Sequence, residues 1–210
     1  MIGGRSSDAG GTAPEPPEWL SNRSLPIQTL TAGTEFWRVH RKASGPLFFG
    51  PGEGVAPTYR FDSASGRFGV LYAARRLDGA VIETLLRAPS QLTVDLSQIR
   101  CRAASLLLSA RDLRLVAAVG ANLSKLGTTA AFSTGPYRVC GRWADVLFLH
   151  PDTPDGILHC SRHDPDEHYI ALFERPDLKM EVVLTRDLDE SLPDVLRTID
   201  RHGKSLTGVP

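Results

Sequence analysis

The sequence predicts a mixed α/β (α+β) fold built as a single compact domain, and three observations support this class. Short apolar, β-prone segments occur in irregular order with helical patterns, unlike the strict strand–helix alternation of a doubly wound fold. The chain contains no Gly-x-Gly-x-x-Gly or P-loop motif. Its 210 residues, 41% of them hydrophobic, suffice for one domain of ordinary size with a full core.

The strand predictions rest on runs of apolar and β-branched residues bounded by glycine and proline. Such runs occupy 36–40, 69–73, 146–149, 157–161, 168–173 and 180–185. Residues 45–57 are rich in glycine and proline and predict a loop, and 151–156 form a strong turn signal.

The helix predictions rest on apolar residues at helical spacing and on end signals. Asp78 is the expected N-cap of a short helix that runs through Arg87. A second helix is predicted over 111–125, with Gly127 as its stop. A third is predicted near the C-terminus, where apolar residues at i, i+3, i+4 and i+7 begin at Leu192 and Gly203 ends the pattern.

Composition limits the classes of binding partner and the cellular location that we expect for the protein. Residues 1–18 combine several glycines and prolines with small polar residues, so we expect a disordered tail there and a folded domain over 20–205. The formal net charge is zero, which gives no electrostatic reason to expect nucleic-acid binding. No apolar run approaches the roughly 18 residues of a membrane span. Three cysteines form no disulfide framework, and we expect a reduced, cytoplasmic protein.

Several polar residues could contribute chemistry, although each has an ordinary structural explanation when it is taken alone. Arg38 and Arg60 could clamp a pyrophosphate with their guanidinium groups, or could be surface arginines. Glu83 could stabilise an oxocarbenium-like ribose, or could be a solvated glutamate near a helix N-terminus. Tyr72 could line a cleft or simply pack at the end of a strand. Ser161 is the last residue of the predicted strand 157–161.

Three competing sites are weak. A metal site built from His159, Cys160, His163 and His168 would need Cys160 to turn toward histidines on the opposite strand face. A Cys–His nucleophile based on Cys160 meets the same obstacle. A Ser–His–Asp hydrolase is not favoured, because no serine lies in a Gly-x-Ser-x-Gly elbow. We therefore expect no metal.

In combination, these segments resemble the RES-domain family, which is named after an arginine, a glutamate and a serine. The resemblance covers roughly residues 35–175. It is carried by 37–40 (Trp-Arg-Val-His), 59–61 (Tyr-Arg-Phe), 70–74 with 80–83 (Val-Leu-Tyr-Ala-Ala followed by Ala-x-x-Glu), and 155–162 (Asp-Gly-Ile-x-x-x-Ser-Arg). The segment 88–150 matches poorly and is interpreted as a possible lineage-specific insertion.

The resemblance implies a compact fold similar to ADP-ribosyltransferases and diphtheria-toxin-like catalytic domains. It also implies a toxin of a bacterial toxin–antitoxin pair that consumes NAD as its substrate, with a helix-turn-helix antitoxin as partner. The matching positions imply Arg60, Glu83 and Ser161 as catalytic residues. They imply Arg38, Arg60, Tyr72 and Ser161 as NAD-binding residues.

Two alternatives differ in what happens to NAD. A protein-modifying ADP-ribosyltransferase on the same fold would differ in its acceptor, and the resemblance associates such enzymes with an acidic residue two positions before the glutamate. Val81 occupies that position, which favours glycohydrolase or phosphorylase chemistry. A catalytically inactive binding module is the other alternative, and the presence of all five site residues argues against it.

Overall fold

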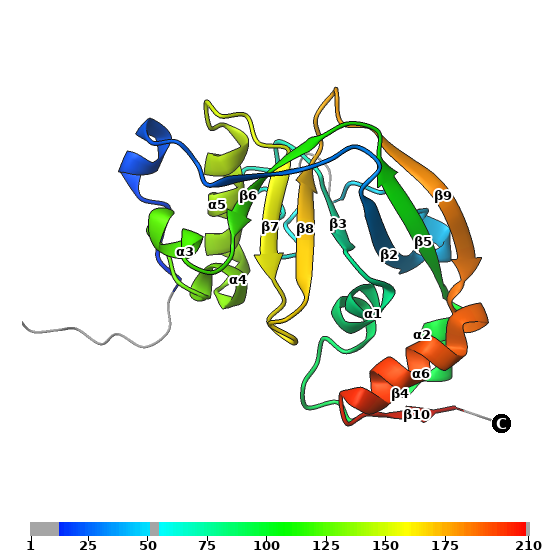
Figure 1. Ribbon diagram of the computed structural model, residues 1–210. Helices are drawn as coiled ribbons and strands as arrows, with labels where there is room; N and C mark the ends of the chain where they lie inside the picture. Colours follow the sequence, from blue (N-terminus) through cyan, green and yellow to red (C-terminus); the bar gives the residue numbers. More distant parts are fainter. Residues whose placement is uncertain (1–12, 51–54, 209–210) are drawn as a thin grey trace, which may run out of the picture.

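The computed structural model describes residues 13–50 and 55–208 (Figure 1). Within this part of the chain, eight strands form one mixed sheet in the order β1-β6-β7-β8-β3-β2-β5-β9. All neighbouring pairs are antiparallel except β6 and β7. The strands are β1 (Ile27–Leu30), β2 (Glu35–Arg41), β3 (Val70–Ala74), β5 (Arg102–Ser109), β6 (Leu113–Ala118), β7 (Gly156–Cys160), β8 (His168–Phe173) and β9 (Met180–Asp187).

The helices form two groups at different ends of the sheet, as Figure 1 shows. One group is α3 (Asn122–Lys125), α4 (Ala131–Thr134) and α5 (Tyr137–Phe148). The other is α1 (Leu77–Leu85), α2 (Leu96–Arg100) and α6 (Leu192–Arg201), beside a small parallel pair of strands, β4 (Thr93–Asp95) and β10 (Ser205–Thr207). Short 3-10 turns occur at Glu18–Asn22, Lys42–Ser44 and Leu188–Ser191. The mixed α/β class and the single compact domain predicted from the sequence are confirmed.

Each helix group buries its own apolar cluster against the sheet. Phe132, Trp143 and Leu147 of the α4–α5 group pack with Val116 and Ile157 of β6 and β7. A second cluster joins α1, α2 and α6 to strands β2, β3 and β5. A third cluster draws its buried members from strands of both halves of the sheet, including β2, β5, β6 and β8. The sheet therefore serves as the common surface on which all the apolar clusters form.

The sheet is weakest between β2 and β3. These strands share a single residue pair, Trp37 with Ala74, whereas β2 pairs with β5 along its whole length. On the other side, β3 pairs with β8 over five positions. The sheet thus consists of two well-paired halves that diverge after one point of contact. This divergence leaves room on the surface for a cleft.

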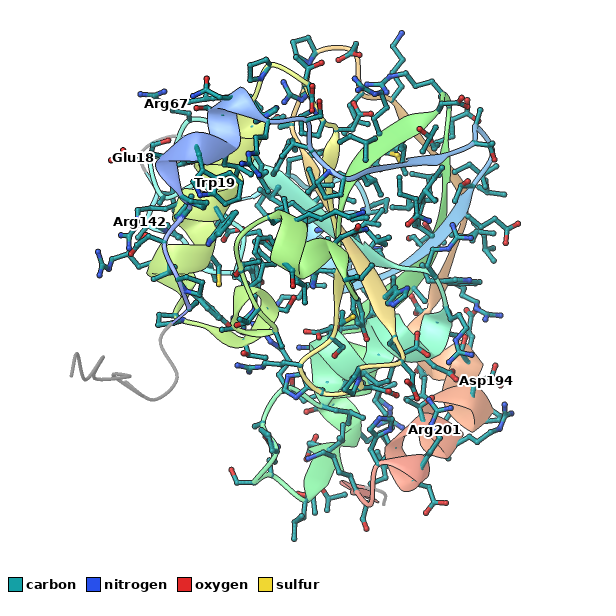
Figure 2. All side chains as sticks on the ribbon, turned by 60° about the vertical axis from the view of Figure 1, so that its left-hand side comes forward. Glu18, Trp19, Arg67, Arg142, Asp194 and Arg201 are labelled. Atoms are coloured by element: carbon teal, nitrogen blue, oxygen red, sulfur yellow. The ribbon has the colours of Figure 1, made fainter. Side chains whose placement is uncertain are left out.

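Residues 13–18 differ from the expected disordered tail. Ala13 is buried, the Pro14 carbonyl accepts a hydrogen bond from Trp143 Nε1 at 2.8 Å, and Glu15 pairs with Arg142. Figure 2 shows Glu18, Trp19 and Arg142 on the same side of the molecule. The buried indole N–H of Trp143 needs an acceptor, and this segment supplies one. The remaining tail positions, 1–12, lie outside the described residues, as do 51–54 of the expected loop.

Two element predictions in the middle of the chain are wrong. The predicted helix over 111–125 is largely strand β6, and only its last turn is helical, as α3. Strand β6 is buried on both faces, so its apolar residues are nearly continuous and match helical spacing by coincidence. The predicted strand 146–149 falls mainly in the final turn of α5. Leu147 in this segment continues the buried face that Val139 and Trp143 begin.

The helix predictions at 78–87 and near the C-terminus are confirmed by α1 and α6, with one correction. Asp78 lies inside the first turn of α1 and does not cap it. Its Oδ1 instead accepts a hydrogen bond from Thr198 Oγ1 at 3.1 Å, and its Oδ2 lies 3.6 Å from Arg201 Nη2. Figure 2 shows Arg201 on α6. Asp78 therefore joins α1 to α6 and fixes the position of the helix that carries Glu83.

Candidate active site

A cleft of about 330 Å³ lies where β2 and β3 diverge, and it is the candidate active site. Its size is at the lower end of the range of about 300–1,000 Å³ that is typical of small-molecule sites. Four of the five residues singled out in the sequence line it: Arg38, Arg60, Tyr72 and Glu83. They come from β2, the loop before β3, β3 itself and α1, so the fold brings together positions that are 45 residues apart.

Ser161, the fifth residue, contacts the side chain of Glu83. Its hydroxyl donates a hydrogen bond to Glu83 Oε1 at 2.8 Å. The same hydroxyl oxygen accepts hydrogen bonds from the backbone N–H groups of His163 and Asp164, at 2.9 and 3.2 Å. Ser161 is buried and is not among the residues that line the cleft. Its proton is therefore directed to the carboxylate, and its geometry favours positioning of Glu83 over direct contact with a ligand.

Helix α1 places Glu83 at the cleft because the helix packs unusually close to the sheet. A Cβ atom at Gly79 would lie 3.1 Å from the Ala74 side chain and 3.3 Å from the hydroxyl of Tyr169. That hydroxyl donates to the Gly79 carbonyl at 3.0 Å and anchors the first turn. Glu83 lies four residues later on the same helix face, so its carboxylate emerges over the adjoining cleft.

Arg60 is held by a tightly bonded turn. Asp62 Oδ2 accepts hydrogen bonds from the backbone N–H groups of Thr58 and Tyr59 at 2.8 and 2.6 Å. Arg60 Nη1 donates to the Gly135 carbonyl at 2.6 Å, and the guanidinium stacks over the ring of Tyr137 at 5.0 Å. These contacts use part of the guanidinium and fix its direction. Burial raises the pKa of Asp62, and the hydrogen bonds to it oppose that shift.

Tyr72 contributes its ring to the cleft and its hydroxyl to this turn. The hydroxyl donates to Asp62 Oδ1 and accepts from the Phe61 N–H, both at 2.9 Å. Burial raises the pKa of Tyr72 well above its ordinary value, and neighbouring Asp62 adds to the shift. The ring meets Tyr59 edge-on, with centroids 5.6 Å apart. Because the hydroxyl is fully engaged, only the aromatic surface of Tyr72 is available to a ligand.

Arg38 lines the cleft and has a buried donor that is unsatisfied among the described residues. Its Nη2 donates to the Phe48 carbonyl at 2.9 Å, whereas its Nη1 is buried with no hydrogen-bond partner among the described residues. Burial lowers the pKa of Arg38 to about 10, so the guanidinium remains charged at neutral pH. A buried, charged N–H group without an acceptor is costly, and an anionic or carbonyl ligand would remove that cost.

The structure also places residues in the cleft that the sequence analysis did not assign to this site. Arg87 lies over the Tyr59 ring at 5.1 Å, and Tyr137 and Tyr169 line the walls. His159, considered in the sequence only as a weak metal ligand, lines the cleft as well. Aromatic and basic residues near Arg60 and Ser161 were the available signals, but their convergence depends on tertiary contacts.

The described residues contain no group of three or more His, Cys, Asp or Glu side chains arranged to hold a metal ion. Burial raises the pKa of the Cys160 thiol, which disfavours its nucleophilic thiolate form. None of the helices in the described part of the chain has the length and hydrophobicity of a membrane span.

The Asp-Gly-Ile block at 155–157 has a structural role. Asp155 receives two hydrogen bonds from the Arg111 guanidinium, at 2.7 and 3.0 Å, and one from the Arg114 N–H at 2.7 Å. These bonds secure the entry to β7 beside β6. The block therefore fixes the strand whose end leads to Ser161.

Comparison with known proteins assigns the family. A family model described as RES domain matches residues 35–193. The chain belongs to the RES-domain family. A search of curated proteins found no match.

Among solved structures, this RES-domain protein is similar to a chain in the crystal structure of the M. tuberculosis MbcT–MbcA toxin–antitoxin complex. The TM-score is 0.61 at 16% sequence identity, and the alignment covers 80% of this chain and 91% of that chain. At this identity, the likeness supports the shared fold.

The RES-domain match runs from residue 35 to residue 193, so the segment 88–150, interpreted from the sequence as an insertion, lies inside the domain. The segment contains β5 and β6, which pair with β2, β9, β1 and β7 inside the main sheet. It is an integral part of the fold.

Proposed function

We propose that this RES-domain protein binds NAD in the cleft and breaks its nicotinamide–ribose bond. The observation that carries the proposal is the carboxylate of Glu83, oriented by Ser161 and placed in a cleft that also holds Arg38 and Arg60. A ligand with two phosphates, two riboses and two aromatic bases matches this combination of guanidinium, carboxylate and aromatic groups. Membership of the RES-domain family and a fold shared with a toxin–antitoxin complex support the same proposal.

The chemical step requires little beyond positioning and electrostatics. The bond between the ribose C1′ and the nicotinamide nitrogen breaks, and its electron pair remains on the departing ring, which thereby becomes neutral. Positive charge develops at C1′ and is stabilised by the Glu83 carboxylate, which also accepts hydrogen bonds from the ribose hydroxyls. Arg38 and Arg60 bind the pyrophosphate, and the aromatic walls pack against the base and the ribose.

The acceptor that attacks C1′ is water or phosphate in this proposal. An ADP-ribosyltransferase on a related fold is the competing function. Its expected second acidic residue would occupy position 81, but Val81 is 1% exposed and packs in the apolar cluster beneath α1. The side chain at position 81 is apolar and buried, so it does not supply a second carboxylate to the cleft. This observation favours hydrolysis or phosphorolysis over transfer to a protein.

We further propose that the protein is the toxin of a toxin–antitoxin pair, active in the cytoplasm and neutralised by a protein that covers the cleft. The shared fold with a member of the MbcT–MbcA complex supports this role. Direct DNA binding is not expected from a chain of zero net charge, so a helix-turn-helix antitoxin would supply any transcriptional control.

Incubation of the purified protein with NAD tests the activity directly. Products are identified by mass with and without inorganic phosphate, and with an added protein extract. Free ADP-ribose would indicate hydrolysis, ADP-ribose phosphorylated at the carbon that carried nicotinamide would indicate phosphorolysis, and mass added to a protein would indicate transfer. NAD that remains intact under all three conditions would favour an inactive binding module.

A further inference from the structure

His159 lines the cleft and carries a buried ring nitrogen that has no hydrogen-bond partner among the described residues. The side chain is 8% exposed and lines the cleft near the end of β7. Its Nδ1 lies 3.0 Å from the Cys160 carbonyl, which can only accept, so the neutral ring carries its proton on Nδ1. Nε2 is then a bare acceptor, and it has no hydrogen-bond partner among the described residues.

The ring of His159 is held in place on both sides. The Phe61 ring meets it edge-on at 4.8 Å, and the Tyr169 ring stacks at 6.0 Å. Burial lowers the pKa of His159 to about 4, opposed by the nearby charge of Glu83 and supported by Arg60. The imidazole is therefore neutral at physiological pH. A fixed, neutral acceptor in a buried site is suited to a neutral N–H or O–H donor.

The donor follows from the proposed function, on which this inference rests. The nicotinamide riboside half of NAD offers the ribose hydroxyls and the carboxamide N–H as donors. In the proposed mechanism the ribose hydroxyls donate to the Glu83 carboxylate, which is the stronger acceptor. The carboxamide N–H group is therefore the donor that remains for His159. We infer that His159 Nε2 accepts a hydrogen bond from the carboxamide of nicotinamide and makes the cleft selective for that group.

This role would distinguish His159 from an ordinary core histidine. A site with a buried acceptor rejects an analogue that lacks the matching donor, because the acceptor is then left unpaired. The analogue 3-acetylpyridine adenine dinucleotide carries a methyl ketone where NAD carries the amide, and it is otherwise the same ligand. We expect native His159 to favour NAD over this analogue by roughly 10- to 100-fold in affinity.

The experiment measures calorimetric affinities for both dinucleotides in the Glu83→Gln background, in which slow cleavage keeps the ligands intact. His159→Phe retains the aromatic packing but removes the acceptor, and should reduce the preference for NAD to within about twofold. His159→Gln can place Oε1 near the position of Nε2 and should retain most of the preference. Thermal unfolding checks that each variant is folded.

The outcomes separate this inference from the proposed function. Failure of the wild-type protein to consume NAD would contradict the proposed activity, yet carboxamide selectivity in the binding assay would still support the role of His159. An equal preference in the native and His159→Phe proteins would overturn the inference even if NAD is cleaved. Equal affinity for the two dinucleotides with native His159, or no binding of either, would also overturn it, and this result does not depend on the folding of a His159 variant.

Discussion

Replacement of Glu83 by glutamine tests the central element of the proposed mechanism. The amide has nearly the same shape as the carboxylate, and its oxygen can still accept the 2.8 Å hydrogen bond from Ser161. The negative charge that would stabilise the developing cation at C1′ is lost. A preorganised electrostatic contact of this kind contributes about 2.7–4 kcal/mol to transition-state stabilisation, so kcat should fall by roughly 100- to 1,000-fold.

The assay follows NAD loss by mass at saturating substrate, so that kcat and KM are measured separately. Glu181→Gln is the matched control, because Glu181 is an exposed glutamate on strand β9 outside the cleft, and its activity should equal that of wild type. A Glu83→Gln protein with wild-type kcat would refute the role of the carboxylate. A change confined to KM would instead indicate a binding contact that is equal in ground and transition states.

Ser161 extends the same prediction through a double-mutant cycle. Ser161→Ala removes a hydrogen bond to a charged group, and we expect a loss of roughly tenfold in kcat because Glu83 is no longer held. In the Glu83→Gln background the same change should have little further effect, since the group that it positions is already disabled. Fully additive losses would show that Ser161 acts independently of Glu83.

The remaining predictions concern binding, stability, pH and growth. Arg60→Ala should weaken NAD binding in calorimetry more than Arg60→Lys does, and lysine should not restore wild-type affinity because it lacks the planar fork; equal affinities would remove Arg60 from the pyrophosphate site. Tyr72→Phe should lower the free energy of unfolding by about 1–3 kcal/mol in urea titrations, since Asp62 loses its buried donor; an unchanged midpoint would contradict this. The folded-state pKa of about 4 for His159 lies below the ordinary value of 6.5, so the contribution of the neutral ring to the free energy of unfolding is complete above pH 6.5 and is lost as the pH falls toward 4. The free energy of unfolding should therefore fall less between pH 7 and pH 5 in His159→Phe than in wild type. Expression of the chain alone should slow bacterial growth and lower cellular NAD, with rescue by Glu83→Ala or by a neighbouring antitoxin gene, whereas normal growth with unchanged NAD would argue against the toxin role.

The elements predicted correctly are those whose local sequence signal agrees with their tertiary environment. Strands β2, β3, β7, β8 and β9 are short β-prone runs bounded by loops, and α6 has one clear apolar stripe with a glycine stop. Strand β6 failed because its two buried faces remove the alternation that identifies a strand. Burial on both faces is a property of the sheet order, which no local window contains.

The features of the candidate site also fall into those that the sequence predicted and those that it could not show. The residue types and their order at 38, 60, 72, 83 and 161 were readable from the sequence and pointed to the family that the domain match assigns. The sequence could not show that Ser161 bonds to Glu83 or that the hydroxyl of Tyr72 is occupied by Asp62.

Taken alone, the sequence determined the fold class, the family and the residue types available for chemistry. Composition, periodicity and short motifs depend only on the order of residues along the chain, so they can be recognised without any knowledge of tertiary contacts. The tertiary structure decided that 88–150 belongs to the sheet and that β2 and β3 diverge to open a cleft. It also decided that Nε2 of His159, a residue lining that cleft, is buried with no hydrogen-bond partner among the described residues. Those features depend on strand order and long-range packing, which bring together groups that are far apart along the chain.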